Sequence, residues 1–160
     1  MANWSNWSNW SGSVSAAPAR IERPRTEAEL AKLVREAAKV RVVGAGHSFM
    51  PLCETNGTLL SLADMEGGIE VNADCTRASA PAGTSLDKLT DVLWKRGASL
   101  INQGDVNPQA LAGAIATGTH GTGATLGSLS TAARSFQIMT HDGSIVSCSA
   151  TENVDLFQAQ

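Results

Sequence analysis

Two glycine-rich segments constrain this chain more than any other feature of its sequence. The first, residues 44–49 (Gly-Ala-Gly-His-Ser-Phe), directly follows the Val-rich run Val40–Val43, and the second covers residues 113–123 (Gly-Ala-Ile-Ala-Thr-Gly-Thr-His-Gly-Thr-Gly). Small residues leave a core poorly filled, but they let backbone N–H groups approach a phosphate or a planar ligand closely. The two segments therefore favour a fold in which loops hold something that is not protein.

The elements before the first segment are a helix and a strand. Thr26-x-x-Glu29 has the form of a capping box, which predicts a helix starting there and running to about Ala38. Apolar residues recur behind it at helical spacing, at Leu30, Leu33, Val34 and Ala37. Val40–Val43 is short, apolar and followed by glycine, so we expect a buried strand that ends at the loop.

A second helix is expected between the two glycine segments. Thr84-x-x-Asp87 is a further capping box, and Gly97 marks the end of the helix. The apolar face of this helix consists of Leu86, Leu89, Val92 and Leu93. Trp94 lies on the same helix, and we expect its ring to lie in the core.

Short runs predict the strands. They cover residues 58–62, 69–71, 136–140 and 145–148, with a weaker strand at 77–81 and an extended stretch around Ile21. Asp142-Gly143 between the last two full runs is a strong hairpin signal. A short helix is expected at 109–115 and another from Asp155 onward. Helices and strands mix without a regular βαβ rhythm, so the predicted fold class is α+β.

Composition narrows the functions. Hydrophobic residues make up 42% of the chain and charged residues 17%, which is typical of a globular domain. The formal net charge is −3 and no basic stripe occurs, so nucleic acid is not expected as a partner. No apolar run is long enough to span a bilayer, and no signal-peptide pattern is present, although membrane association is left open. Three cysteines without C-x-x-C spacing indicate reduced thiols, no metal site and a cytoplasmic location.

The N-terminus repeats Asn-Trp-Ser three times, starting at Asn3, Asn6 and Asn9. Each copy has the form of an N-glycosylation sequon, but without a signal peptide we expect no glycosylation. We assign residues 1–17 to an N-terminal extension. Its tryptophans either dock on the domain or belong to a segment that frays.

The first glycine segment departs from the Rossmann dinucleotide fingerprint. That fingerprint needs a third glycine and a helix that opens at the loop. Phe49 stands at the third glycine position, and Pro51 with Asn56-Gly57 disfavours a helix. Asp64 and Glu66 have about the spacing of a ribose-binding acid, but without the helix we do not expect them to bind a ribose.

Taken singly, the motifs leave alternatives open. His47 either caps a turn or lies within bonding distance of a planar ligand that the neighbouring glycines admit. Residues 113–123 form either a tightly packed turn or a segment whose N–H and hydroxyl groups bind phosphate and ring atoms.

Together, the motifs resemble the PCMH-type FAD-binding domain of the vanillyl-alcohol-oxidase superfamily. The branch is that of the aldonolactone and alditol oxidases, whose members include L-gulono-1,4-lactone and D-arabinono-1,4-lactone oxidases and dehydrogenases. The resemblance lies in residues 9–12, Pro24, and residues 42–49, 102–105 (Asn-Gln-Gly-Asp) and 113–123. It extends from about Trp10 to Phe157, and the two glycine motifs are specific as a pair.

The resemblance implies a domain organisation. Residues 18–160 would form a PCMH-type FAD-binding domain of two small α/β subdomains, incomplete at its C-terminus. The substrate-binding cap of the family would be absent, and with it the residues that activate the substrate hydroxyl.

The resemblance also implies the residues that bind FAD. His47 would be the histidine linked covalently to the 8α-methyl group of the isoalloxazine. The loop around the pyrophosphate would consist of Val42, Val43, Gly44, Ala45, Gly46, His47, Ser48 and Phe49. Gly104, Asp105 and Gly113 would pass near the flavin ring, and Thr117, Gly118 and His120 would make further contacts.

The implied chemistry is hydride transfer from a CH–OH group of a sugar-1,4-lactone or alditol to the flavin, with oxygen or another acceptor taking the electrons. FAD would supply the redox chemistry, and the protein would supply position and electrostatics. Two alternatives are a noncatalytic, truncated remnant of such an oxidase, and an oxidase of the same superfamily that acts on a phenol, an amine or a hydroxy acid.

Overall fold

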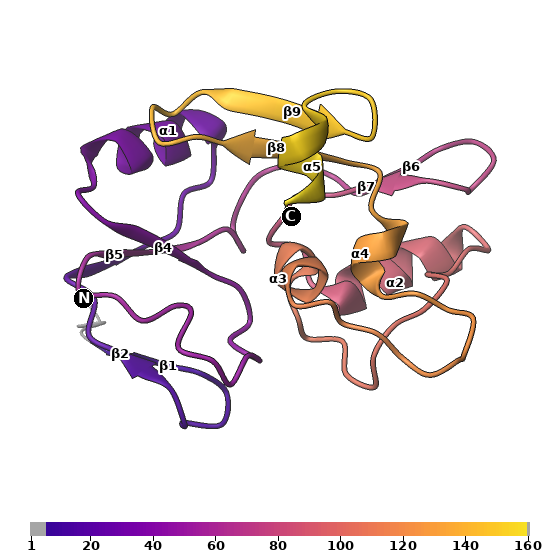
Figure 1. The fold of residues 1–160 in the computed structure, drawn as a ribbon, viewed down its shortest axis with the longest axis horizontal. Helices are drawn as coiled ribbons and strands as arrows, with labels where there is room; N and C mark the ends of the chain where they lie inside the picture. Colours follow the sequence, from indigo (N-terminus) through magenta and orange to yellow (C-terminus); the bar gives the residue numbers. More distant parts are fainter. Residues whose placement is uncertain (1–5, 160) are drawn as a thin grey trace.

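The computed structural model describes residues 6–159, so the Asn-Trp-Ser copy that starts at Asn3 lies outside the described residues. Figure 1 shows a mixed fold of short helices and strands. In chain order the elements are β1 (Trp7–Ser8), β2 (Ser15–Ala16), β3 (Arg20–Glu22), α1 (Glu27–Glu36), β4 (Val40–Val43), β5 (Thr58–Ser61), β6 (Glu70–Val71), β7 (Ala78–Ser79), α2 (Leu86–Lys95), α3 (Leu111–Ala116), α4 (Leu129–Ala132), β8 (Ser135–Met139), β9 (Ile145–Ser149) and α5 (Val154–Gln158). The predicted α+β class is confirmed.

A parallel sheet of three strands forms the centre of the N-terminal lobe, which comprises β1–β5 and α1 (Figure 1). The strand order is β3-β5-β4, so β5 lies between the two strands that α1 connects. Leu59 and Leu60 of β5 are 0% and 1% exposed, as expected for a strand with neighbours on both edges. The hairpin of β1 and β2 belongs to the same lobe and had no counterpart among the predicted strands.

α1 begins at the predicted capping box. The Thr26 hydroxyl accepts a hydrogen bond from the Glu29 N–H at 3.2 Å, and the Glu29 carboxylate accepts one from the Arg25 N–H at 2.8 Å. These bonds satisfy N–H groups that the first turn of a helix leaves without partners. The helix ends at Glu36, slightly earlier than predicted, and Ala37 is its C-cap.

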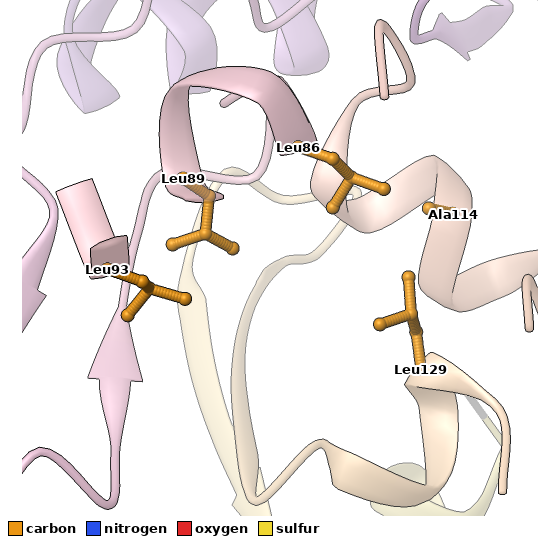
Figure 2. Close-up of a cluster of buried hydrophobic side chains, with 5 residues drawn as sticks. All are labelled: Leu86, Leu89, Leu93, Ala114 and Leu129. Carbon is orange, nitrogen blue, oxygen red and sulfur yellow. The ribbon is translucent and has the colours of Figure 1, made fainter. Parts of the chain in front are cut away.

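The C-terminal lobe, which comprises β6, β7 and α2–α4, has a core of its own. Figure 2 shows side chains from three helices pointing toward one another: Leu86, Leu89 and Leu93 of α2, Ala114 of α3 and Leu129 of α4. All five are buried. The apolar face predicted for the second helix is therefore confirmed at its three leucines.

The cap of α2 corrects a prediction. The Ser85 hydroxyl, not that of Thr84, accepts the hydrogen bond from the helix, donated by the Lys88 N–H at 3.2 Å. The Thr84 carbonyl instead accepts from the Leu111 N–H at 2.8 Å, at the start of α3. A tertiary contact therefore uses the backbone of Thr84, and the helix starts one residue later.

The expectation for Trp94 was wrong. Its side chain is 79% exposed, whereas Leu93 beside it is buried. Successive helical residues point about 100° apart, as follows from 3.6 residues per turn. A stripe centred on Leu86, Leu89 and Leu93 therefore directs the next side chain toward solvent.

The hairpin of β8 and β9 forms at the predicted turn. Its register runs from Ser135 opposite Ser149 to Met139 opposite Ile145. The carboxylate of Asp142 accepts hydrogen bonds from the side chains of Thr140 and Ser144, which hold the pKa of this exposed carboxyl well below its usual value. The turn lies against α1, because a Cβ added at Gly143 would be 3.2 Å from the Cβ of Ala31. The hairpin thus reaches back to the N-terminal lobe (Figure 1).

The remaining differences are at element ends. The short helix expected at 109–115 is α3, Leu111–Ala116, and the weak strand expected at 77–81 contracts to Ala78–Ser79. α4 was not predicted.

The cysteines Cys53, Cys75 and Cys148 are free thiols. Within residues 6–159, no helix has the length and apolar character needed to cross a membrane.

Candidate functional site

The first glycine segment leaves the sheet at the carboxyl end of β4. This end is where ligands bind in open parallel sheets. Val43 is 5% exposed, so its side chain belongs to the core, whereas Val42 is 55% exposed. Residues 44–57 form no helix before β5 begins, which agrees with the rejection of a Rossmann loop.

The loop offers unused hydrogen-bond donors. Within residues 6–159, no backbone N–H from Gly44 to Phe49 donates a hydrogen bond to another residue. Buried or ligand-facing N–H groups need a partner, and a run of free amides beside glycines suits the oxygens of a phosphate. The loop is therefore chemically fit for the pyrophosphate of a dinucleotide.

The β1–β2 hairpin is hydrogen-bonded to this loop. The Trp10 N–H donates to the Gly46 carbonyl at 3.1 Å, and the Asn9 side-chain amide donates to the Ser48 carbonyl at 3.1 Å. A Cβ added at Gly46 would lie 3.2 Å from the indole of Trp7. A side chain at Gly46, which has φ +70°, would therefore require the hairpin to shift.

His47 is half-buried between the two tied carbonyls. Its ring stacks on the indole of Trp10, with centroids 5.5 Å apart and an interplanar angle of 22°. Phe49 approaches the same indole edge-on at 6.1 Å and is itself 65% exposed. The imidazole thus lies in an aromatic setting at the surface of the loop.

At Gly44 the first glycine segment contacts the residue just before α3, the helix in which the second segment begins. A Cβ added there would lie 3.0 Å from the Cβ of Ala110, the residue that precedes α3. Gly113 follows in α3, and no atom would lie within 4 Å of a Cβ added to it. The contact places the entry to the second segment against the turn of the first.

The remaining predicted residues lie around the end of α3. A Cβ added at Gly104 would be 3.3 Å from the Thr119 methyl and 3.6 Å from the His120 carbonyl, so the 102–105 segment lies beside the second glycine segment. Thr117 donates its hydroxyl to the Gly113 carbonyl at 2.9 Å, and Gly118 has φ +62°. The His120 ring nitrogen Nδ1 contacts the carbonyl of Gly121 at 2.9 Å.

Cys53 lies close to the loop without taking a redox partner among the described residues. Its thiol donates to the Val42 carbonyl at 3.4 Å. Burial raises the pKa of the Cys53 thiol, and the nearby positive charge of Arg41 opposes this change only in part. The thiol therefore stays protonated at neutral pH and acts as a weak donor to the strand end.

Asp64 and Glu66, which have about the spacing of a ribose-binding acid, pair with arginines. Asp64 forms an ion pair with Arg23 at 2.9 Å, and Glu66 forms one with Arg25 at 3.5 Å. Both pairs tie the segment before α1 to the segment after β5. That neither acid binds a ribose stays a prediction.

Two open cavities lie outside the first glycine loop. One, of about 610 Å³, borders α2 and residues 98–105 and carries the carboxylates of Asp87, Asp91 and Asp105, which disfavour a phosphate. The other, of about 790 Å³, lies between the β1–β2 hairpin and residues 51–56. Neither cavity is lined by residues 42–49. The candidate site is therefore defined by the free amides of the loop and by the stacked rings of Trp10 and His47, not by a cavity. Within residues 6–159, no cluster of histidine, cysteine or acidic side chains could hold a metal ion.

Sequence reasoning did not include Asn9, Trp10 or Ala110 among the site residues. All three act through contacts with residues far along the chain. For Asn9 and Trp10, membership of the resembling segment 9–12 was a signal, whereas nothing local marks Ala110.

Comparison with known proteins agrees with this geometry. The FAD binding domain family matches residues 18–149. An L-gulono-1,4-lactone dehydrogenase of Mycobacterium tuberculosis is 40% identical over 142 residues, which is 86% of this chain and 33% of the relative. An L-gulonolactone oxidase of Mus musculus is 31% identical over 157 residues, or 98% of this chain and 35% of the relative. The chain thus spans about a third of the length of these relatives.

A solved structure gives the same fold. The glucooligosaccharide oxidase of Acremonium strictum, which carries a 6-S-cysteinyl, 8α-N1-histidyl FAD, superposes with a TM-score of 0.84 at 25% identity, over 95% of this chain and 33% of the oxidase. Because the family match covers most of the chain and both glycine segments, the chain belongs to the FAD binding domain family, and its cofactor is FAD.

Proposed function

We propose that this chain is the FAD-binding portion of an oxidoreductase that takes a hydride from a CH–OH group of a sugar-1,4-lactone or an alditol. The flavin is attached covalently to His47, and oxygen or another acceptor reoxidises it. One observation carries the proposal: Gly44 of the first glycine segment lies against Ala110, just before the second segment, in a loop with free amides and a half-buried imidazole.

The names of the relatives support the substrate class. Both carry out their chemistry on L-gulonolactone by name, one as a dehydrogenase and the other as an oxidase. An alditol presents the same carbinol group without the lactone ring. The difference between the two relatives leaves oxygen and other electron acceptors both within the proposal.

The proposed roles of the individual residues come from the family resemblance. The backbone amides of residues 44–49 bind the pyrophosphate. Val42 and Val43 form the end of β4, which directly precedes these residues. By the resemblance, Gly104, Asp105 and Gly113 would lie beside the flavin ring, and a Cβ added at Gly113 would have no described atom within 4 Å. Thr117, Gly118 and His120 complete the site. When bound, FAD supplies the hydride acceptor.

Attachment of the flavin to His47 is a two-electron oxidation that forms one C–N bond. The solved oxidase with 8α-N1-histidyl FAD indicates the type of bond. One C–H bond of the 8α-methyl group and one N–H bond of the imidazole break, and a C–N bond forms. The two protons and two electrons that are released pass to dioxygen and give hydrogen peroxide. The imidazole must therefore be held with a nitrogen facing the methyl carbon.

Acid precipitation tests the proposal. The chain is purified from cells rich in riboflavin and precipitated with acid, and the flavin is measured in pellet and supernatant. We expect flavin in the pellet of the wild type and none in that of His47→Ala, because only a covalent bond survives denaturation. His141→Ala, which removes an exposed histidine of the β8–β9 turn, is the matched control and should keep the wild-type amount.

The other outcomes are equally informative. Flavin that appears only in the wild-type supernatant would retain FAD binding but refute the covalent link. Acid-stable flavin in His47→Ala would move the link to another residue. A colourless wild type would favour the noncatalytic alternative.

A further inference from the structure

Trp10 stacks on His47, the candidate flavin-linking histidine, although the Trp10 side chain contributes little to the core. Its side chain is 61% exposed. The indole nevertheless covers one face of the His47 ring at 5.5 Å. Offset or tilted stacking of this kind is an attractive geometry for two aromatic rings. The contact therefore orients the imidazole more than it stabilises the fold.

The backbone on both sides of His47 is held by the same hairpin. The carbonyl before it, of Gly46, accepts from the Trp10 N–H, and the carbonyl after it, of Ser48, accepts from the Asn9 amide. Adjacent hairpin residues thus hold the peptide unit that precedes His47 and the one that follows Ser48. Together with the ring stack, this makes three points of attachment around one side chain.

The hairpin is itself rigid at these points. Asn9 is 3% exposed, and its carbonyl oxygen Oδ1 accepts from the Val14 N–H at 3.0 Å while its amide also donates to the Ser13 hydroxyl at 3.1 Å. The backbone of Asn9 donates to the Val14 carbonyl at 2.9 Å. A buried amide with this many partners has one orientation. The clamp on His47 therefore has a fixed base.

We propose that Trp10 is a positioning residue for flavin attachment: the β1–β2 hairpin holds the His47 imidazole, through the Trp10 stack, in the orientation that its bond to the flavin requires. This inference rests on the proposed attachment at His47. A free histidine ring samples a broad range of its second side-chain torsion. The stack removes most of that range before the flavin arrives, which raises the fraction of molecules poised to react.

A time course of attachment tests this role. The chain is prepared from riboflavin-limited cells and mixed with FAD under air, and acid-stable flavin is measured in samples quenched at intervals. Trp10→Ala should lower the initial rate about tenfold while noncovalent FAD, measured by filtration before attachment proceeds, stays close to the wild-type amount. Trp10→Phe should recover most of the rate, because a phenyl ring also offers a face for stacking.

Trp94→Ala is the matched control. It removes an equally large and more exposed indole, 79% exposed, from α2, and should attach flavin at the wild-type rate. If Trp10→Ala attaches flavin as fast as the wild type, the positioning role is overturned and the attachment at His47 stands. If the wild type acquires no acid-stable flavin, the attachment itself fails, and this inference fails with it.

A second measurement needs no flavin. In the flavin-free chain, the ring current of Trp10 should shift the His47 ring protons upfield in the NMR spectrum, and Trp10→Ala should abolish this shift. His47 protons with the same chemical shifts in both proteins would overturn the stack, and the inference, whatever the flavin does.

Discussion

Gly46 shows how a single backbone conformation shapes the candidate site. Its φ of +70° lies in the left-handed region, which costs other residues about 1 kcal/mol or more. Its missing side chain also makes room, because a Cβ there would lie 3.2 Å from the Trp7 indole and 3.4 Å from the Cα of Asn9. Gly97, after α2, has the same φ of +70° but no atom within 4 Å of an added Cβ.

These two glycines separate backbone strain from crowding. Gly97→Ala should lower the free energy of unfolding by about 1 kcal/mol, the cost of the left-handed conformation alone. Gly46→Ala should lower it by about 2–3 kcal/mol, because the hairpin must also move away from the loop. Urea denaturation followed by circular dichroism measures both. Equal losses would mean that the hairpin does not press on Gly46 in solution.

At the scale of elements, α2 shows that a helix start depends on more than its sequence pattern. Thr84-x-x-Asp87 and Ser85-x-x-Lys88 both offer a hydroxyl three residues before a helical N–H. The backbone of Thr84 is taken up by the start of α3, and Ser85 caps the helix. The choice between two neighbouring hydroxyls was therefore made by α3.

The cap assignment predicts unequal effects at neighbouring positions. Ser85→Ala should lower the free energy of unfolding by about 1 kcal/mol, the usual value of an N-cap hydroxyl. Thr84→Val removes a hydroxyl that does not cap the helix and keeps the branched shape, so it should lower the free energy of unfolding by less than Ser85→Ala does. Thermal unfolding of both variants against the wild type provides the comparison. A larger loss for Thr84→Val would restore the cap to Thr84.

Across the whole molecule, the contact of Gly44 with Ala110 joins two lobes that have separate cores. The sheet core contains Leu59 and Leu60, and the helical core is built around Leu86, Leu89 and Leu93. Carbon atoms in contact normally lie about 3.5–4.0 Å apart, so the 3.0 Å that a Cβ at Gly44 would leave is too short. A side chain at Gly44 would therefore push this loop away from the start of α3.

A double-mutant cycle tests the junction. Gly44→Ala should lower the free energy of unfolding by about 1 kcal/mol through crowding and should weaken FAD retention. Ala110→Gly removes the atom that crowds it and leaves a residue that N-cap positions accept. The double variant should regain most of the loss, with a coupling of about 0.5–1 kcal/mol. Strict additivity would place the two segments apart in solution.

Much of the fold could be predicted because its signals are short-range. The capping box at Thr26, the leucine spacing of α2 and the Asp142-Gly143 turn each act within a few residues, and each formed as expected. The cofactor was implied by the resemblance of the paired glycine motifs to a known family, and small residues are compatible with a backbone that approaches a phosphate closely. These features needed no knowledge of the path of the chain.

The tertiary structure alone decided which residues meet. It moved the α2 cap to Ser85, set Ala110 against Gly44 and laid the Trp10 indole on His47. Each of these depends on two segments far apart in sequence reaching the same place, and a contact of that kind leaves no periodic trace in either segment. Local sequence thus determined most of the elements, the resemblance to a known family implied the ligand, and long-range packing determined the geometry of the site.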